Sequence, residues 1–214
     1  MYIPPSFAAP DPTAVSQAIE EYSFAHVISG ADGNLVASHL PLLYDRTDGP
    51  HGTLLGHMAR ANPQWQAAAG GPVLAIFAGP HAYVSPRWYE AERVVPTWNY
   101  VAVHAYGRLE LVEEPGPAES ILRRTVAHYE GQRWQLPNDR DFVESLLRQI
   151  VAFRIPVERL EGKWKLSQNQ PPARREKVAA ALEQSGREAD RAVAREMRRL
   201  MAPAAYPGKS ASPS

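Results

Sequence analysis

The sequence predicts a mainly β protein of the α+β class, an antiparallel and closed or nearly closed barrel with peripheral helices and a C-terminal helical tail. Roughly six strand-like stretches follow one another within about 140 residues, separated by short turns rather than by repeated helical crossovers. The 214 residues include 20 Pro and 14 Gly, which is typical of a fold with many turns. With 44% hydrophobic and 21% charged residues, the chain can bury a core of ordinary size.

The charge balance and the cysteine count exclude several classes of function. The 23 Lys and Arg residues cancel the 23 Asp and Glu residues, so the protein as a whole does not attract nucleic acid or an anionic membrane. Any such partner would have to meet a local basic patch. The absence of cysteine excludes disulfides, thiolate metal sites and a cysteine nucleophile. The chemistry must therefore use oxygen, nitrogen or a cofactor.

We find no targeting or membrane segment in the sequence. The opening residues, MYIPP, lack a basic region followed by an apolar one. The longest purely apolar run, 73–78, is far shorter than the ~18 residues of a membrane-spanning helix. We therefore expect a cytoplasmic protein with no membrane partner.

Turn residues and changes of hydrophobic period divide the first part of the chain. Asp11 and Pro12 are typical of a helix start, and apolar residues then recur at helical spacing up to Tyr22. Strand-like stretches lie at 24–29, 35–44, 53–58, 73–78, 82–85 and 97–113. Helices are expected at 62–69, 117–129 and 139–150, and the last strand material at 151–155 and 164–166.

The C-terminal part has a helical pattern. Apolar residues from 173 to 202 line one helical face, and Gly186 predicts an interruption that gives two helices or one bent helix. Residues 204–214 are small and polar, which predicts a frayed end. The sequence thus predicts a barrel domain over 1–170, a helical extension over 171–203 and a disordered tail over 204–214.

The charges of this extension allow two interpretations. Residues 174–199 carry eight basic and five acidic side chains, and this excess could touch DNA or form an ordinary solvated helix face. No helix-turn-helix with a convincing recognition helix is present. DNA therefore stays a possible partner without support from the overall charge.

Seven histidines raise the question of a metal site. His51 and His57 would share one face of an unbroken strand, but His51 belongs to a Pro-His-Gly turn. No second His or carboxylate pair stands at ligand spacing. We therefore predict no metal and interpret the histidines as solvated or hydrogen-bonded.

The segment 56–65, GHMARANPQW, allows an anion site at the step from a strand into a helix. His57 and Arg60, with the free N–H groups of a helix start, could point at a phosphate. Alternatively, Asn62 caps a helix with Pro63 at its first position, and Arg60 lies in solvent. The residues alone leave both interpretations open.

Two further segments could contact a planar ligand. Large aromatic residues gather in the turns and strand starts of 79–89 and 96–100, where they form either a stacking surface or a small aromatic core under long loops. The amide and hydroxyl groups of 162–170, GKWKLSQNQ, could bind the edge of a heterocycle or cap the turn before the last helix.

Taken in order, several of these motifs resemble the PaiB family of FMN-binding negative transcriptional regulators. The resemblance runs from residue 1 to about residue 170 and is carried by MYIP, SHLP, GHMARANP, GPHAYVSP, PTWNY and KLSQN. It implies an FMN-binding split β-barrel similar to the pyridoxamine-phosphate oxidase type. It also implies a homodimer with FMN at the subunit interface.

The resemblance further implies cofactor-binding residues. His57, Arg60 and Asn62 match the element near the FMN phosphate. Thr97, Trp98 and Asn99 match the strand that enters the flavin cleft, whereas Lys165, Ser167 and Gln168 match an element that reaches the partner's flavin. Further candidates are His39, Ser85 and Tyr89. After Asn169 the sequence departs from the family pattern, so the role of the tail is not transferred.

Three functions remain open at this point. The resemblance implies an FMN-binding negative transcriptional regulator. Alternatively, the chain is an FMN-dependent oxidoreductase or flavin reductase, with His57, His81 or Tyr89 on the open side of the ring, because the cofactor supplies the reactivity. In the third interpretation, a flavin-free barrel serves protein contacts.

Overall fold

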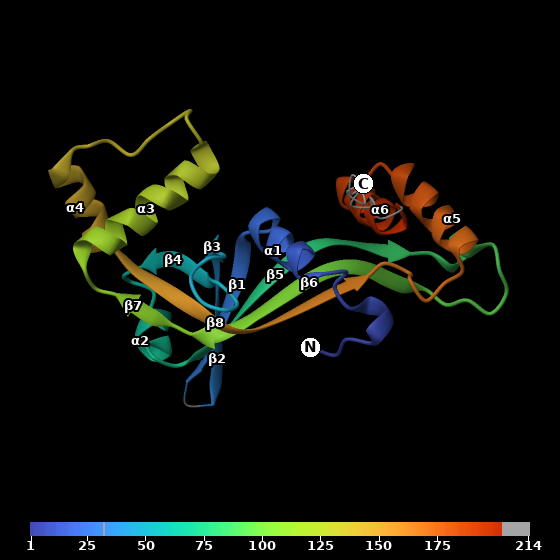
Figure 1. The fold of residues 1–214 in the computed structure, drawn as a ribbon, viewed down its shortest axis with the longest axis horizontal. Coiled ribbons are helices and arrows are strands. Elements are labelled where there is room, and N and C mark those ends of the chain that lie inside the picture. Colours follow the sequence, from blue (N-terminus) through green and yellow to red (C-terminus); the bar gives the residue numbers. More distant parts are fainter. Residues whose placement is uncertain (32, 203–214) are drawn as a thin grey trace, which may run out of the picture. The chain divides into compact units, whose positions relative to one another are not determined.

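The computed structural model describes residues 1–31 and 33–202, so the predicted tail over 204–214 lies outside the described residues. Figure 1 shows the elements in chain order. The helical elements are η1 (Pro5–Phe7), α1 (Pro12–Glu21), α2 (Gln64–Ala68), η2 (Pro86–Tyr89), α3 (Pro115–Glu130), α4 (Arg140–Gln149), α5 (Pro172–Glu183) and α6 (Glu188–Met201). The strands are β1 (Phe24–Ala31), β2 (Asn34–Pro41), β3 (Leu43–Asp45), β4 (Thr53–Ala59), β5 (Pro72–Val84), β6 (Thr97–Arg108), β7 (Glu110–Val112) and β8 (Ile150–Lys165).

The described strands form one eight-stranded sheet in the order β2-β1-β5-β6-β8-β4-β3, and β7 pairs with β8. The β1–β2 hairpin pairs antiparallel from Phe24 with Pro41 to Ala31 with Asn34, and β4 pairs antiparallel with β8. Short turns connect several neighbouring strands, as the turn residues of the sequence predict. The predicted combination of antiparallel strands and peripheral helices is thus observed.

The first helix forms as its cap residues predict. The Asp11 carboxylate accepts a hydrogen bond from the backbone N–H of Ala14 at 2.8 Å, and Pro12 occupies the first turn. The apolar face of α1 buries Val15 and Ile19.

Two strands are longer than predicted. β5 runs through the Gly-Pro step at 79–80 without a break, although two strands were expected there. Pro lacks a donor, but the pairing of β1 with β5 covers only Val73 to Ile76, so Pro80 breaks no bond of that ladder. Likewise β8 is one strand over 150–165, where two short pieces were expected.

The long strand expected over 97–113 is divided at Leu109. The N–H of Leu109 donates to the carbonyl of Gly71 at 3.1 Å, and the N–H of Gly70 donates to the carbonyl of Leu109 at 2.8 Å. Leu109 therefore bonds the loop after α2 and not a neighbouring strand. As a result, β6 ends at Arg108 and β7 begins at Glu110. This long-range pairing leaves no local signal in the sequence.

The chain forms two compact units. Unit 1 comprises Met1–Gly79 and Val101–Trp164, and unit 2 comprises Pro80–Tyr100 and Lys165–Ser214, of which the structure describes the residues up to 202. The core of unit 1 includes the fully buried side chains of Leu54, Phe77 and Phe153. The predicted boundaries at 170 and 203 stay a prediction.

Unit 2 contains the paired helices α5 and α6. Gly186 lies between them, so the interruption predicted there divides the extension into two helices. Leu182 of α5 and Val193 of α6 are completely buried. None of the helices in the described ranges has the length and apolar character needed to cross a membrane.

Candidate functional site

A polar cluster in unit 1 lies where β4 leads into α2. The Asn62 side chain accepts a hydrogen bond from the N–H of Gln64 at 3.0 Å, and its amide nitrogen donates to the Ser38 hydroxyl of β2 at 2.8 Å. Asn62 thus caps the start of α2, as one of the two sequence interpretations expects. It also joins the helix to the β1–β2 hairpin.

Gln64 anchors this helix and was not predicted from the sequence. Its side chain is 1% exposed, and its amide nitrogen lies within hydrogen-bond distance of the Val27 carbonyl (2.9 Å), the Ser29 hydroxyl (3.1 Å) and the Val36 carbonyl (3.2 Å). Its Oε1 is buried and has no hydrogen-bond partner among the described residues. A glutamine directly after Asn-Pro gives no sign by itself that it is buried, so pattern reasoning does not find it.

Arg60 lies at the end of α4. Its Nε donates to the Arg148 carbonyl at 2.8 Å, and its Nη2 donates to the Ile150 carbonyl at 2.6 Å. Its backbone N–H donates to the carbonyl of Gln149 at 2.8 Å. The last carbonyls of a helix lack hydrogen-bond donors within the helix, and Arg60 supplies the donors here. Two of its guanidinium nitrogens are thus engaged with the backbone, although the side chain is exposed.

Three histidines lie on the strands β1, β2 and β4 of unit 1. Burial lowers the pKa of His57 on β4, so the imidazole is uncharged at pH 7, and its buried Nδ1 has no partner among the described residues. His39 on β2 pairs in register with His26 on β1, and their rings meet edge to face with centroids 4.5 Å apart. The Nδ1 of His26 also lacks a partner within the described ranges.

These groups offer hydrogen bonds to an anionic oxygen. The Ser38 hydroxyl already accepts a bond from Asn62, which leaves its own proton to donate. His57 contributes a ring nitrogen without a partner in the described part of the chain, whereas the buried Gln64 oxygen is an acceptor and cannot bond an anionic oxygen. The donor set is therefore mostly neutral, and a phosphate would be held by hydrogen bonds more than by ion pairs.

Three of the predicted site residues, Asn99, Ser167 and Tyr89, lie together in unit 2, and a fourth, Ser85, is buried in the same unit. Asn99 is fully buried; its amide nitrogen donates to the Ser167 hydroxyl at 3.1 Å and to the Met197 sulfur at 3.5 Å. The Tyr89 and Ser167 hydroxyls are 3.3 Å apart. Ser85 accepts a bond from the N–H of Arg87 at 3.3 Å, which caps η2. Asn99, Ser167 and Tyr89 thus form one buried network.

An exposed aromatic surface also lies in unit 2. Trp98 is 51% exposed, Tyr83 meets it edge to face at a centroid distance of 6.0 Å, and His81 lies 6.3 Å away. The Lys165 ammonium donates to the Thr97 hydroxyl and to the Trp98 carbonyl. These aromatics are therefore exposed, whereas Tyr89 of the same segment is buried, and Lys165 fixes the strand that carries Trp98.

Gln168 is used locally. Its side-chain oxygen accepts a hydrogen bond from the N–H of Leu166 at 2.7 Å. Ser167 between them has a φ of 65°, a left-handed conformation that residues other than glycine rarely adopt. The hydroxyl and amide groups of this segment thus cap its turn, which was one of the two interpretations.

Comparison with known families decides the identity of the fold. A family described as "Putative FMN-binding domain" matches residues 1–159, which is most of the chain. This chain belongs to that FMN-binding family. FMN is therefore its cofactor, as the sequence motifs implied. The ring nitrogens of His26 and His57 that lack partners among the described residues can donate to a ligand oxygen in one tautomer.

Two relatives support the family assignment. The chain is 40% identical over 175 residues to the protease synthase and sporulation protein PAI 2 of Bacillus subtilis (strain 168), covering 79% of this chain and 83% of the relative. It is 32% identical over 214 residues to an uncharacterized protein of Aspergillus fumigatus, covering 75% and 81% of the two chains. The first relative is PaiB, and the predicted resemblance to the PaiB family is confirmed.

Solved structures confirm the fold. The FAD and heme binding protein from Mycobacterium smegmatis superposes with a TM-score of 0.58 at 16% identity, covering 80% of this chain and 78% of that protein. The flavocytochrome Anf3 from Azotobacter vinelandii superposes with a TM-score of 0.57 at 16% identity, covering 74% and 69%. The split-barrel fold expected for the FMN-binding family is thus confirmed. Which residues hold FMN stays a prediction.

Proposed function

We propose that this FMN-binding protein is a homodimer that oxidises or reduces a small molecule. The supporting observation is the exposed aromatic surface of unit 2, formed by His81, Tyr83 and Trp98. A flat heterocyclic ring stacks favourably on such a surface. FMN supplies the redox chemistry when bound, and the residues of the chain bind and orient the reactants.

We propose that the polar cluster of unit 1 holds the FMN phosphate. Ser38 and Asn62 provide fixed hydrogen-bonding groups, and neutral His57 provides a ring nitrogen that can donate in one of its tautomers. Arg60 has a supporting role, because its guanidinium already bonds the carbonyls at the end of α4. His39 on the same hairpin as Ser38 is a further candidate contact.

The Arg60→Ala variant separates the two roles of this arginine. Because two hydrogen bonds to backbone carbonyls disappear at an exposed site, we expect the free energy of unfolding to fall by about 1–2 kcal/mol. FMN affinity should fall by less than about tenfold, since the other phosphate donors remain. Urea unfolding and fluorescence titration with FMN measure both quantities. Arg133→Ala, at an exposed arginine with one long bond of 3.4 Å, is the control. Unchanged stability with a hundredfold loss of FMN affinity would contradict this assignment.

The surface of the β1–β2 hairpin supports a homodimer. Phe24 and Leu35, which share one face of the hairpin, are 62% and 81% exposed. The two lie toward opposite ends of the hairpin, since Phe24 pairs with Pro41 and Leu35 with Gly30. Exposed apolar side chains along an edge hairpin are typical of a surface that another chain covers. We therefore propose this face as part of the dimer contact. Light scattering that gives the mass of a single chain, 23.7 kDa, would contradict the proposal.

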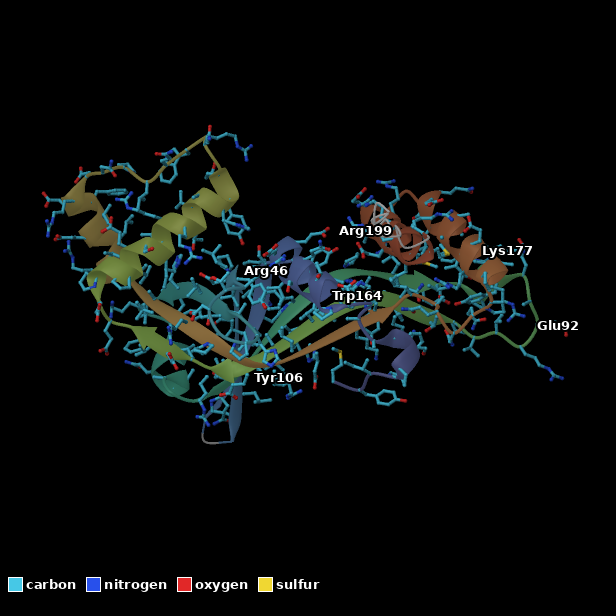
Figure 2. All side chains as sticks on the ribbon, in the orientation of Figure 1. Arg46, Glu92, Tyr106, Trp164, Lys177 and Arg199 are labelled. Carbon is cyan, nitrogen blue, oxygen red and sulfur yellow. The ribbon has the colours of Figure 1, made fainter. Side chains whose placement is uncertain are left out.

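Transcriptional regulation is the second candidate, favoured by the 40% identity to PaiB. Direct DNA contact through α5 and α6 has little support from the side chains. Arg191 and Arg195 pair with Glu188, and Arg198 pairs with Glu176 and Glu183. Figure 2 labels Lys177 and Arg199, which pair with Glu90 and Glu196. Such paired arginines offer little charge to a phosphate backbone.

Anaerobic mixing with a reduced nicotinamide tests the redox function. The FMN-loaded protein is mixed with NADH or NADPH, and we expect the flavin absorbance to bleach as a hydride passes from the nicotinamide to FMN. Trp98→Ala should slow the bleaching, whereas Trp134→Ala, at an exposed tryptophan of unit 1, should not. If dithionite reduces the bound FMN but neither NADH nor NADPH does, the reductase function is excluded and the regulator is favoured.

A further inference from the structure

Unit 1 contains a cavity of which the proposed function uses only Arg60, at the rim. It has a volume of about 600 Å³ and is lined by residues of β7, β8, α3 and α4 and by Trp65 of α2. Figure 1 labels these elements. Its apolar floor is formed by Val112 of β7, Ala118 of α3, Leu147 of α4 and Ala152 of β8. A volume in this range suits a small organic ligand.

The floor of the cavity belongs to a packed core. Ala152 is part of a buried cluster with Leu43, Leu55 and Ile121, and Val112 and Ala118 pack against that cluster. Side chains in such a cluster are held in fixed positions. The cavity is therefore preformed and does not depend on the closure of a loop.

The rim of the cavity carries an excess of positive charge. Arg140 pairs with Glu144 at 2.9 Å, so these two charges neutralise each other. The remaining charged side chains of the lining are two arginines, Arg60 and Arg148, and one acid, Glu113. Arg148 makes no side-chain hydrogen bond or ion pair with any described residue, in contrast to Arg60, whose guanidinium bonds the end of α4.

One wall of the cavity is aromatic. Trp65 is half-buried, and its indole N–H donates to the Arg60 carbonyl at 3.0 Å, which fixes the orientation of the ring. The cavity thus combines an apolar floor, an aromatic wall and an arginine at the rim without a partner among the described residues. These features together favour a ligand that has an apolar body and one negative group.

We propose that this cavity binds a small organic anion, an aryl or alkyl carboxylate or sulfonate, with its apolar body on the floor and its charged group at Arg148. The cavity shares Arg60 with the FMN site proposed above, but its charged anchor, Arg148, and its apolar floor do not belong to that site, so the two proposals are tested by different variants. A cationic ligand of the same shape does not fit, because the rim carries an excess positive charge once the Arg140 pair is formed.

Fluorescence titration of the full, FMN-saturated chain with anilinonaphthalene sulfonate tests the proposal. We expect saturable binding of one sulfonate per chain, displaced by phenylbutyrate and not by phenylbutylamine, its cationic counterpart. Arg148→Gln should weaken sulfonate binding roughly tenfold, because a charge-assisted bond is lost. Ala118→Leu should weaken it by filling the floor, with circular dichroism confirming that this variant is folded. Arg133→Gln, remote from the lining, is the matched control and should bind like the parent chain.

Four results would overturn the proposal. The first is absence of saturable binding, and the second is an equal loss in Arg148→Gln and Arg133→Gln. The third is equal displacement by the acid and the amine. The fourth is displacement of the sulfonate when FMN is added to the flavin-free chain. The last result would mean that flavin occupies this cavity. Failure of FMN itself to bind would refute the proposed function and leave the sulfonate titration of the flavin-free chain to decide this proposal.

Discussion

Asn99→Ala should lower the free energy of unfolding by about 2–3 kcal/mol, because it removes a fully buried amide that bonds Ser167 and contacts the Met197 sulfur. The substitution leaves the Ser167 hydroxyl with fewer partners and leaves a small cavity under α6. Urea unfolding followed by circular dichroism and by tryptophan fluorescence measures the loss.

Two further variants make this experiment specific. Asn169→Ala removes an exposed asparagine from the same segment of unit 2 and should change stability by less than about 0.5 kcal/mol. Ser167→Ala combined with Asn99→Ala should cost less than the sum of the two single changes, because the two side chains share their bonds. An Asn99→Ala variant as stable as the parent would show that the network contributes nothing to unit 2.

Gln64→Ala is expected to have an effect of similar size in unit 1. Its amide nitrogen lies near three acceptors of the β1–β2 hairpin, so the change leaves buried carbonyls without a donor and should cost about 2–3 kcal/mol. Gln64 also positions the helix whose cap, Asn62, bonds Ser38. We therefore expect FMN affinity to fall together with stability.

The control for Gln64 lies on the same helix. Gln66 is exposed, so Gln66→Ala should leave both the unfolding free energy and FMN affinity close to those of the parent chain. Chemical denaturation and FMN titration of both variants provide the comparison. If Gln64→Ala bound FMN normally in spite of a large loss of stability, the proposed position of the phosphate near α2 would be wrong.

The sequence predicted elements whose signals are local. Asp11 and Pro12 marked the start of α1 correctly, and Gly186 marked the break between α5 and α6. The split of β6 from β7 could not be predicted, because it depends on the pairing of Leu109 with the loop at 70–71. Two strands were expected at 73–78 and 82–85, but β5 continues through Pro80, because the effect of a proline depends on whether a neighbouring strand needs its N–H at that position.

The site could be predicted only as a set of residues. Motif order pointed to Asn62, Asn99 and Ser167 as important, but only the structure distinguishes a capping residue from members of a buried network. Arg60 was expected at a phosphate, yet its two bonds to the end of α4 join positions nearly ninety residues apart, which no local pattern reveals. Gln64 was missed for the same reason, since its hydrogen-bond partners lie on the β1–β2 hairpin, far from α2 in the sequence.

The central claim is that this chain binds FMN, and titration of the purified protein with FMN tests it most directly. Flavin absorbance and fluorescence are recorded while FMN is added to the full chain. We predict saturable binding with one FMN per chain, as expected for a member of the FMN-binding family. Absence of saturable binding would contradict the account and remove every FMN contact proposed here.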